Sequence, residues 1–216
     1  DSNGAFYRLE DTQRMTKNDD CLYGYAAATQ FSSLMNINVS HFYQKVYMEG
    51  GKNFYGYNGA TPLTTALLSV KYFVADSPLY ANDLRTLVGQ RGNLFLYRNK
   101  YCLPMGYMID EDDVLAFEEC KENKLQGLNA LAYSLGAETT YMVGANYLIE
   151  QKEGCSTITV NDDGYYYAAY TTCTSDQLTV ESDDGRKMTY SKTTHPYLID
   201  LGYYKAGSDI RISNSK

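Results

Sequence analysis

The sequence lacks tryptophan, has only two histidines, and contains no apolar run near the ~20 residues that a membrane-spanning helix needs. It also lacks any run of five like charges, and its formal net charge is -7 at pH 7. Because contacts to phosphates require clustered Lys and Arg, this charge balance argues against binding to nucleic acid or to an anionic membrane surface.

Motifs for metal, nucleotide and nucleophile chemistry are absent as well. The five cysteines form no CxxC pair, and with only His41 and His195 beside them no zinc-binding spacing can be assembled. The glycines compose no phosphate-binding loop, and the sequence has no GxSxG nucleophile motif. The sequence therefore predicts no metal site, no cofactor and no catalytic residue in this chain.

Tyrosine is abundant, with 23 residues beside 7 phenylalanines. Its ring packs in strands and on half-wet surfaces while its hydroxyl finds a polar partner, so the composition favours a chain rich in β-sheet. Two tyrosine runs, 165–167 and 203–204, could supply rings that stack on sugars. In a strand, successive side chains point to opposite faces, so at least one ring of the triplet is expected in the core.

Local signals predict mixed helices and strands over residues 1–150. Thr61 and Pro62 are typical of a helix start, because threonine caps a free amide and proline needs no donor there. Asp112 and Asp113 favour another helix start through the helix dipole. The predicted strands are 5–11, 70–75, 93–98 and, paired with or adjacent to the last of these, 103–109. The predicted helices are 39–47 with a stop at Gly50-Gly51, a short one after Thr61, 114–120, and 125–135 with an end at Gly136.

Residues 151–216 show a different pattern, in which short strands alternate with turns. The predicted strands are 157–160, 165–172, 178–181, 187–191, 197–201 and 209–212. Two Asp-Asp-Gly tripeptides, 162–164 and 183–185, are interpreted as hairpin turns. Regular short strands with turn signals predict an antiparallel β-sandwich, and the whole chain is predicted to be α+β with a domain boundary near residue 150.

Charged and polar side chains near the N-terminus form the most interesting candidate set, which comprises Arg8, Glu10, Asn18 and Asp19. They carry opposite charges and lie close together in the sequence. One interpretation is a binding site, and the other is a structural ion pair beside a capped turn. The acidic run 110–113 is interpreted as a solvated helix start, because adjacent carboxylates on an extended chain would point to opposite faces.

Several ordered blocks resemble the bacterial YfhO family. They are Arg8-Leu9-Glu10, Lys17-Asn18-Asp19, Phe31-Ser32-Ser33, Phe42-Tyr43, Tyr57-Asn58-Gly59 and 67–74 (LLSVKYFV). The resemblance covers about the first half of the chain, and Asp163-Gly164-Tyr165 and Lys205-Ala206-Gly207 add a weaker similarity later. The family often has Arg after the Asn-Gly turn, where this chain has Ala60, and Gly where this chain has Ser69.

The resemblance implies an extracytoplasmic C-terminal region of a polytopic membrane protein similar to GT-C type glycosyltransferases. Such a parent protein would use a lipid-linked sugar donor in cell-envelope glycosylation of the lipoteichoic-acid type. The family's catalytic acidic residues are expected on loops between transmembrane helices, so none is assigned here. The sequence does not begin with methionine, which predicts processing or excision from a longer protein.

These observations lead to one expected function and one alternative. The chain is expected to be a soluble extracytoplasmic region, tethered to the bacterial cell membrane in the full-length protein, that helps to bind an acceptor or glycan rather than to catalyse. The expected partners are the transmembrane portion of the parent protein and an envelope glycan or teichoic acid. The expected contacts are Arg8, Glu10, Asn18, Asp19, Tyr57 and Asn58. The alternative is a structural or partner-docking module with no glycan contact.

Overall fold

The computed structural model describes residues 5–76, 84–119, 124–152, 154–169, 177–183, 185, 187–190 and 197–215. The chain divides into two compact units, Asp1–Tyr141 and Met142–Lys216. The first unit contains helices and two small sheets, and the described elements of the second are all strands, so the fold is α+β as predicted. The boundary predicted near residue 150 falls within strand β8 (Tyr147–Lys152).

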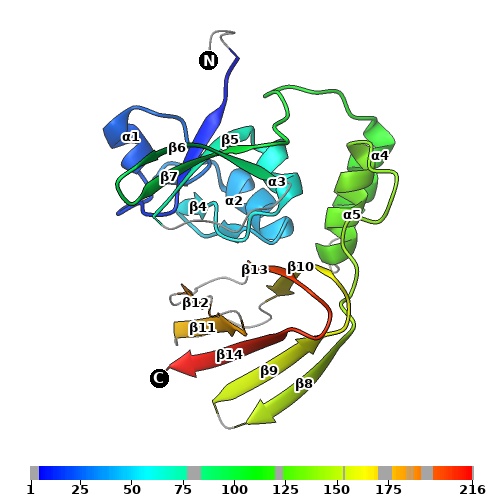
Figure 1. Cartoon of the computed structure of the whole chain (residues 1–216). Helices are drawn as coiled ribbons and strands as arrows, with labels where there is room; N and C mark the ends of the chain where they lie inside the picture. The colour runs from blue at the N-terminus through cyan, green and yellow to red at the C-terminus, as the bar shows by residue number, and fades with distance from the viewer. Residues whose placement is uncertain are drawn as a thin grey trace. The chain divides into compact units, whose positions relative to one another are not determined.

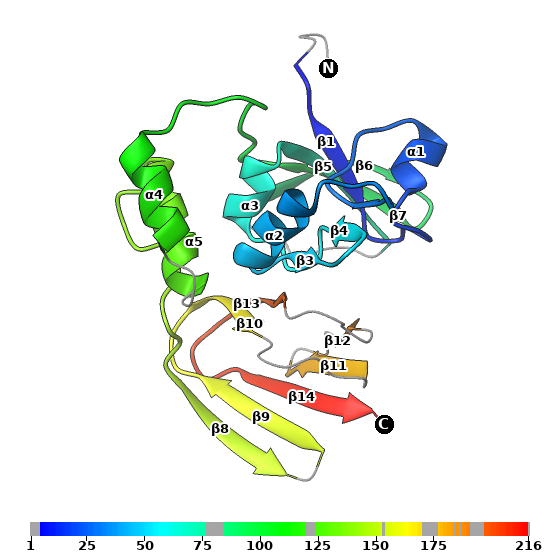
Figure 2. The same ribbon diagram turned by 180° about the vertical axis from the view of Figure 1, so that it is seen from behind.

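A four-stranded sheet forms the centre of the first unit (Figures 1 and 2). Its order is β1 (Arg8–Asp11), β5 (Val70–Ala75), β7 (Leu94–Asn99) and β6 (Arg85–Arg91). The β1–β5 pair is parallel and the other two pairs are antiparallel. The strands at 5–11, 70–75 and 93–98 are therefore confirmed, with ends that differ by at most three residues.

The other elements that the structure describes in the first unit are five helices and a three-stranded sheet. The helices are α1 (Asp19–Tyr23), α2 (Ile37–Lys45), α3 (Pro62–Leu67), α4 (Glu111–Glu119) and α5 (Lys124–Ser134), and the small sheet has the order β2 (Gln30–Phe31), β4 (Phe54–Gly56) and β3 (Glu49–Gly50). Helix α3 contacts β5, α2 contacts β3 and β4, and α4 contacts α5. The buried apolar residues of this unit include Met48, Val70, Phe73, Tyr97 and Leu128.

The predicted helix start at Thr61 is confirmed as a capping box. The Thr61 side chain accepts a hydrogen bond from the backbone N–H of Thr64, and the Thr64 hydroxyl accepts one from the backbone N–H of Thr61. Two amides that would otherwise lack partners are thereby satisfied. The helix turns into β5 at Ser69, whose φ of 55° lies in the left-handed region. Non-glycine residues seldom adopt that conformation.

Helix α2 ends earlier than the glycine signal predicted. Its last residue is Lys45, and the chain reverses at Tyr47, which has a φ of 60°. Gly50 and Gly51 therefore do not form the helix stop. A Cβ atom at Gly50 would collide with the backbone and hydroxyl of Ser40, so this glycine permits a close approach between α2 and β3.

One predicted strand is wrong, and five observed strands were not predicted, namely β2, β3, β4, β6 and β8. Residues 103–109 form no strand, and β7 pairs instead with β5 and with β6, which the sequence patterns did not predict. The helix start at the acidic run is confirmed, because α4 has Glu111, Asp112 and Asp113 in its first turn. The predicted end of α5 is also confirmed at Gly136, which has a φ of 92°.

The second unit contains a five-stranded and a two-stranded sheet. The five-stranded order is β12 (Lys187–Tyr190), β11 (Gln177–Ser182), β14 (Asp209–Ser215), β9 (Cys155–Val160) and β8, and the two-stranded sheet pairs β10 (Gly164–Ala169) with β13 (Leu198–Tyr204). All of these pairs are antiparallel. Buried residues from both sheets form one apolar core, which includes Val160, Val180, Ile199, Leu201 and Ile210. The β-sandwich itself stays a prediction.

The two Asp-Asp-Gly tripeptides have different roles. The segment 183–185 joins β11 to β12, which pair with each other, so a hairpin forms there as predicted. The segment 162–164 joins β9 to β10, and these two strands belong to different sheets. The hairpin prediction is wrong at this second position, because the same turn residues carry the chain from one sheet to the other.

Candidate functional site

Strand β1 places Glu10 inside the first unit, where the residue is 1% exposed. Its carboxylate accepts hydrogen bonds from the backbone N–H of Ala28 at 2.5 Å and from the hydroxyl of Thr29 at 3.1 Å. Arg14 lies on the other side, with its Nη1 atom 3.6 Å from Glu10 Oε2. Three different segments of chain are therefore held together through one carboxylate.

Burial raises the pKa of Glu10 to about 7, against an ordinary value of 4.5. Desolvation is the largest cause, because taking a carboxylate out of water penalises its charged form. The positive charge of Arg14 and the hydrogen bonds from Ala28 and Thr29 act in the opposite direction but do not cancel it. Glu10 therefore changes its charge near neutral pH.

Asp19 begins α1 and closes the polar loop that precedes it. Its carboxylate accepts hydrogen bonds from the Met15 N–H at 2.6 Å, the Thr16 N–H at 3.0 Å and the Thr16 hydroxyl at 2.6 Å. The Thr16 hydroxyl is the main cause that lowers the pKa of Asp19. Asp19 is therefore an ionised anchor for the loop over the whole neutral range.

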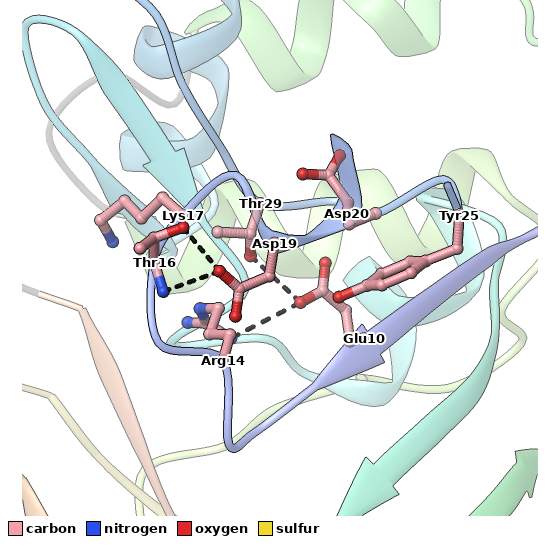
Figure 3. Close-up of a pocket in the computed structure, with 9 residues that line it drawn as sticks. Glu10, Arg14, Thr16, Lys17, Asp19, Asp20, Tyr25 and Thr29 are labelled. Atoms are coloured by element: carbon pink, nitrogen blue, oxygen red, sulfur yellow. Dashed lines mark hydrogen bonds and ion pairs between the residues drawn. The ribbon is translucent and has the colours of Figure 1, made fainter. Parts of the chain in front are cut away.

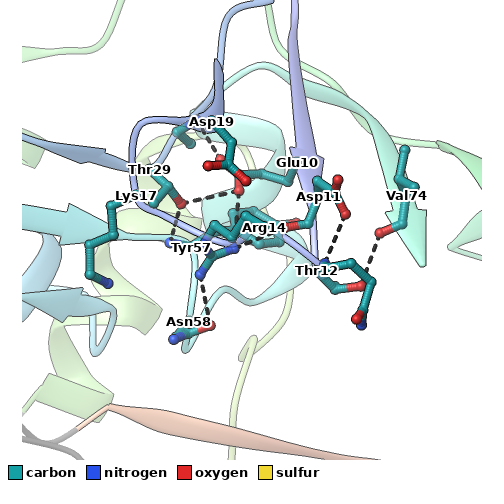
Figure 4. Close-up of polar contacts among 12 residues, drawn as sticks. Glu10, Asp11, Thr12, Arg14, Lys17, Asp19, Thr29, Tyr57, Asn58 and Val74 are labelled. Carbon is teal, nitrogen blue, oxygen red and sulfur yellow. Dashed lines mark hydrogen bonds and ion pairs between the residues drawn. The ribbon is translucent and has the colours of Figure 1, made fainter. Parts of the chain in front are cut away.

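Asn58 lies at the exposed edge of this region, in the turn after β4. Its side-chain carbonyl accepts a hydrogen bond from Arg14 Nη2 at 3.2 Å, and its amide donates to Glu49 Oε2 at 3.0 Å. Lys17 completes the group, since its ammonium lies 2.8 Å from the same Glu49 oxygen. Figure 4 shows Arg14 reaching from the Glu10 side to Asn58. We call Arg14, Lys17, Glu49 and Asn58 the polar rim.

A small hollow with a cavity volume of about 10 Å³, open to solvent, lies beside the polar rim. Its lining includes Glu10, Arg14, Lys17, Asp19, Asp20 and Tyr25 (Figure 3). A cavity needs ~10–15 Å³ to hold one water molecule. The hollow therefore has room for about one water molecule, and a ligand would lie on the surface beside it.

The structure connects four of the six predicted contact residues. Glu10 and Asp19 line the hollow, and Asn58 joins them through Arg14. Tyr57 is buried in the same unit. Its N–H donates to the Thr29 hydroxyl, and its own hydroxyl shares a hydrogen bond with Thr65. Glu10 and Tyr57 are both buried, so they support the site from within.

The other two predicted contact residues have partners elsewhere. The guanidinium of Arg8 donates to the Leu68 carbonyl at 2.7 Å, which ties β1 to the end of α3. The side-chain carbonyl of Asn18 accepts from the Phe31 N–H at 2.8 Å and so fixes β2 to the start of α1. Neither residue is among those that line the hollow.

Sequence reasoning missed Arg14, Lys17, Thr29 and Glu49 as members of this site. Arg14 and Lys17 belong to a polar loop, and Glu49 follows a helix, so nothing in their local pattern distinguishes them from surface charges. Their positions depend on β1 pairing with β5 and on the turn after β4, which are contacts between distant parts of the sequence. The spacing of charges along the chain could not have identified them.

The groups at this site can donate and accept hydrogen bonds. The polar rim presents a guanidinium, an ammonium, a carboxylate and an amide, which together offer both donors and acceptors. Among the residues that the structure describes, no group of three His, Cys, Asp or Glu side chains could hold a metal ion. The buried Glu10 is 1% exposed, so it is placed to orient Arg14 and not to touch a ligand.

The family of the chain follows from comparison with known proteins. No curated protein matches it. One solved structure, protein NMB1881 from Neisseria meningitidis, matches 35% of this chain and 89% of its own length. The match has 16% sequence identity and a TM-score of 0.15, which is too low to indicate a shared fold. Within the described part of the chain, no helix is long and apolar enough to cross a membrane. The family model described as bacterial membrane protein YfhO matches residues 1–216, so the chain belongs to the YfhO family.

Proposed function

We propose that this chain is an extracytoplasmic region of its parent membrane protein that binds and orients an acceptor glycan or polymer. The reaction served would be envelope glycosylation of the lipoteichoic-acid type, carried out by the membrane-embedded portion of the parent. The family assignment supports the membrane protein, and the polar rim supports the binding role. The chain itself would position the acceptor and leave the chemistry to the rest of the protein.

The observation that carries this proposal is the fixed geometry of the polar rim. Arg14 is held between Glu10 and Asn58, and Asn58 is held between Arg14 and Glu49. Side chains that already have one partner lose less conformational freedom when a ligand binds. A hydroxyl-rich polymer needs several donors and acceptors over a small area, and the polar rim supplies both at the protein surface.

Hydroxyl groups are the ligand groups expected at this site. The polar rim contains two cations, Arg14 and Lys17, and one carboxylate, Glu49, and the adjoining hollow adds the carboxylates of Asp19 and Asp20. Because carboxylates outnumber cations here, hydroxyls that donate to Glu49 and accept from Asn58 fit better than a dense run of phosphates. In a teichoic-acid polymer, these hydroxyls would supply the main contacts, and an occasional phosphate would lie near Arg14 or Lys17.

The test is an NMR titration of the chain with a glycerol-phosphate oligomer as a teichoic-acid fragment. We expect shifts of the Asn58 side-chain amide and of the surrounding backbone amides at millimolar ligand. Asn58→Ala should weaken binding several-fold. Gln90→Ala removes another exposed amide from the same unit and serves as the matched control. Absence of shifts in this region, or equal affinity of the two variants, would contradict the proposal.

The alternative function is a structural module without glycan contact. It is favoured by the hydrogen bonds that Asp19 accepts from Met15 and Thr16 and that Glu10 accepts from Ala28 and Thr29, because these bonds tie separate segments of the chain together. In this case Asn58→Ala would alter the unfolding temperature and no oligomer would shift the Asn58 amide. The same titration therefore distinguishes the two functions.

A further inference from the structure

The two-stranded sheet of the second unit separates its tyrosines by face. Tyr166 and Tyr204 point to the core, where Tyr204 is 2% exposed and Tyr166 packs against the buried cluster. Tyr165 and Tyr203 are direct cross-strand partners on the opposite face, and they are 40% and 37% exposed. The predicted division of the tyrosine run between the two faces is therefore observed, and it leaves one pair of rings at the surface.

The two exposed rings lie in contact. Their centroids are 5.2 Å apart and their planes meet at 70°, so the edge of one ring is directed at the other. Such an arrangement is a favourable one for aromatic pairs and keeps the rings in a defined orientation. We call Tyr165 and Tyr203 the tyrosine platform.

A charged pair stands at one end of the tyrosine platform. The Lys205 ammonium lies 2.6 Å from Asp163 Oδ2 and 5.4 Å from the centroid of the Tyr203 ring. The other Asp163 oxygen accepts a hydrogen bond from the Ala206 N–H at 2.9 Å. An ammonium has three donors and a carboxylate about four acceptor positions, so the pair retains bonding capacity beyond these contacts.

Stability alone accounts for little of this arrangement. A cross-strand aromatic pair and an exposed ion pair each stabilise a fold only weakly. The combination does match the chemistry of a pyranose sugar. One side of the sugar ring presents C–H groups that pack on an aromatic ring, and its rim presents hydroxyls that can donate to a carboxylate and accept from an ammonium.

We propose that the tyrosine platform, with Asp163 and Lys205 at its end, binds a pyranose unit of a neutral glycan. This inference rests on the proposed function for its ligand class. The residues of the tyrosine platform lie in the second unit, and none of them belongs to the polar rim. The two sites would contact different parts of a polymer. The tyrosine platform holds a sugar ring by stacking, and the polar rim holds hydroxyl or phosphate groups by hydrogen bonds.

The test uses two neutral probes, chitotriose and maltotriose, in an NMR titration of the chain with labelled tyrosine rings. We expect shifts of the Tyr165 and Tyr203 ring signals with at least one of the probes. Tyr203→Ala and Tyr165→Ala should each raise the dissociation constant roughly tenfold, and Asp163→Asn should raise it less. Because both rings are outside the core, these variants should fold, which the dispersion of the backbone amides verifies.

The matched control is Tyr147→Ala, which removes a tyrosine of comparable exposure, 49%, from β8 of the same unit. Unchanged affinity in this control and loss in the two platform variants would support the inference. Two results would overturn it: no ring shift with either probe, or shifts that persist unchanged in both platform variants. The proposed function is read separately, from the Asn58 amide with the glycerol-phosphate oligomer, so either idea can fail while the other stands.

Discussion

The guanidinium of Arg14 lies 3.6 Å from the buried carboxylate of Glu10, and this contact links the interior of the first unit to its surface. From the same guanidinium, Nη2 donates to Asn58 and Nη1 to the Asp11 carbonyl. The charge of Glu10 therefore bears directly on the polar rim, even though Glu10 is inaccessible.

The free energy of unfolding should fall as the pH rises through the range between the unfolded and folded pKa values of Glu10. The folded value is about 7 and the ordinary value is 4.5, so the folded state binds more protons between them. The stabilisation that comes from the protonated Glu10 carboxyl is fully present below pH 4.5. It is lost as the pH rises to about 7. The loss should be ~3 kcal/mol, at 1.36 kcal/mol per pKa unit.

Chemical denaturation of the wild type and of Glu10→Gln over this pH range checks the sign. The glutamine variant cannot ionise, so its stability should vary much less with pH. Glu150→Gln removes an exposed carboxylate from β8 and should leave the wild-type profile unchanged. An equally steep profile in Glu10→Gln would assign the effect to another group.

Replacing Arg14 by methionine should destabilise the first unit in a way that depends on pH. At about pH 8, where Glu10 is charged, loss of the partner should cost about 2 kcal/mol. At about pH 5, where Glu10 is protonated, the cost should be less than about 1 kcal/mol. Arg91→Met, at the exposed end of β6, is the control. Equal destabilisation at both pH values would mean that Arg14 acts through packing alone.

Ser69→Gly should stabilise the chain by about 1 kcal/mol, because glycine adopts a positive φ without a Cβ clash. Ser69 has a φ of 55°, is fully buried, and its hydroxyl has no hydrogen-bond partner within the described residues. Ser69→Ala removes the hydroxyl but keeps the strained backbone, so it should gain less than the glycine variant. Thermal unfolding of both variants measures the order. Ser33→Gly, at an exposed position, should not stabilise.

Thr61→Ala should lower the stability of the first unit by about 1 kcal/mol, the usual cost of losing a helix cap. The hydroxyl of Thr61 is the acceptor for the Thr64 N–H, and the site is 1% exposed, so water does not readily replace it. Thr61→Ser keeps the acceptor and should recover most of the loss in equilibrium denaturation. If serine and alanine were equally harmful, the buried methyl group would be the cause.

The sequence predicted elements well where a local chemical signal marks their ends. Thr61 and Pro62 begin α3 as expected, and the acidic run begins α4. Strand pairing was harder to predict from the sequence, because it depends on contacts between residues that are far apart along the chain. Residues 103–109 were predicted as a strand but pair with no strand among the residues that the structure describes. Strand β6, which has an arginine at each end and one glycine within it, pairs with β7 despite its weak pattern.

The candidate site was predictable in part for the same reason. Glu10 and Asp19 were recognised as unusual carboxylates near opposite charges, and both line the hollow. Arg14 and Glu49, which complete the site, come from segments whose local pattern is that of ordinary solvated charges. Only the folded chain brings them to Asn58, so their role follows from tertiary structure and not from spacing.

Strand β8 has a practical consequence for how the second unit can be isolated. It forms one edge of the five-stranded sheet, and its Tyr147 and Ile149 lie on the same face as Val160 and Ile158 of β9. A fragment beginning at residue 151 would lose most of β8 and leave the backbone of β9 as an open edge, a known starting point for aggregation. A fragment beginning at Met142 keeps that edge covered and should remain monomeric at far higher concentrations.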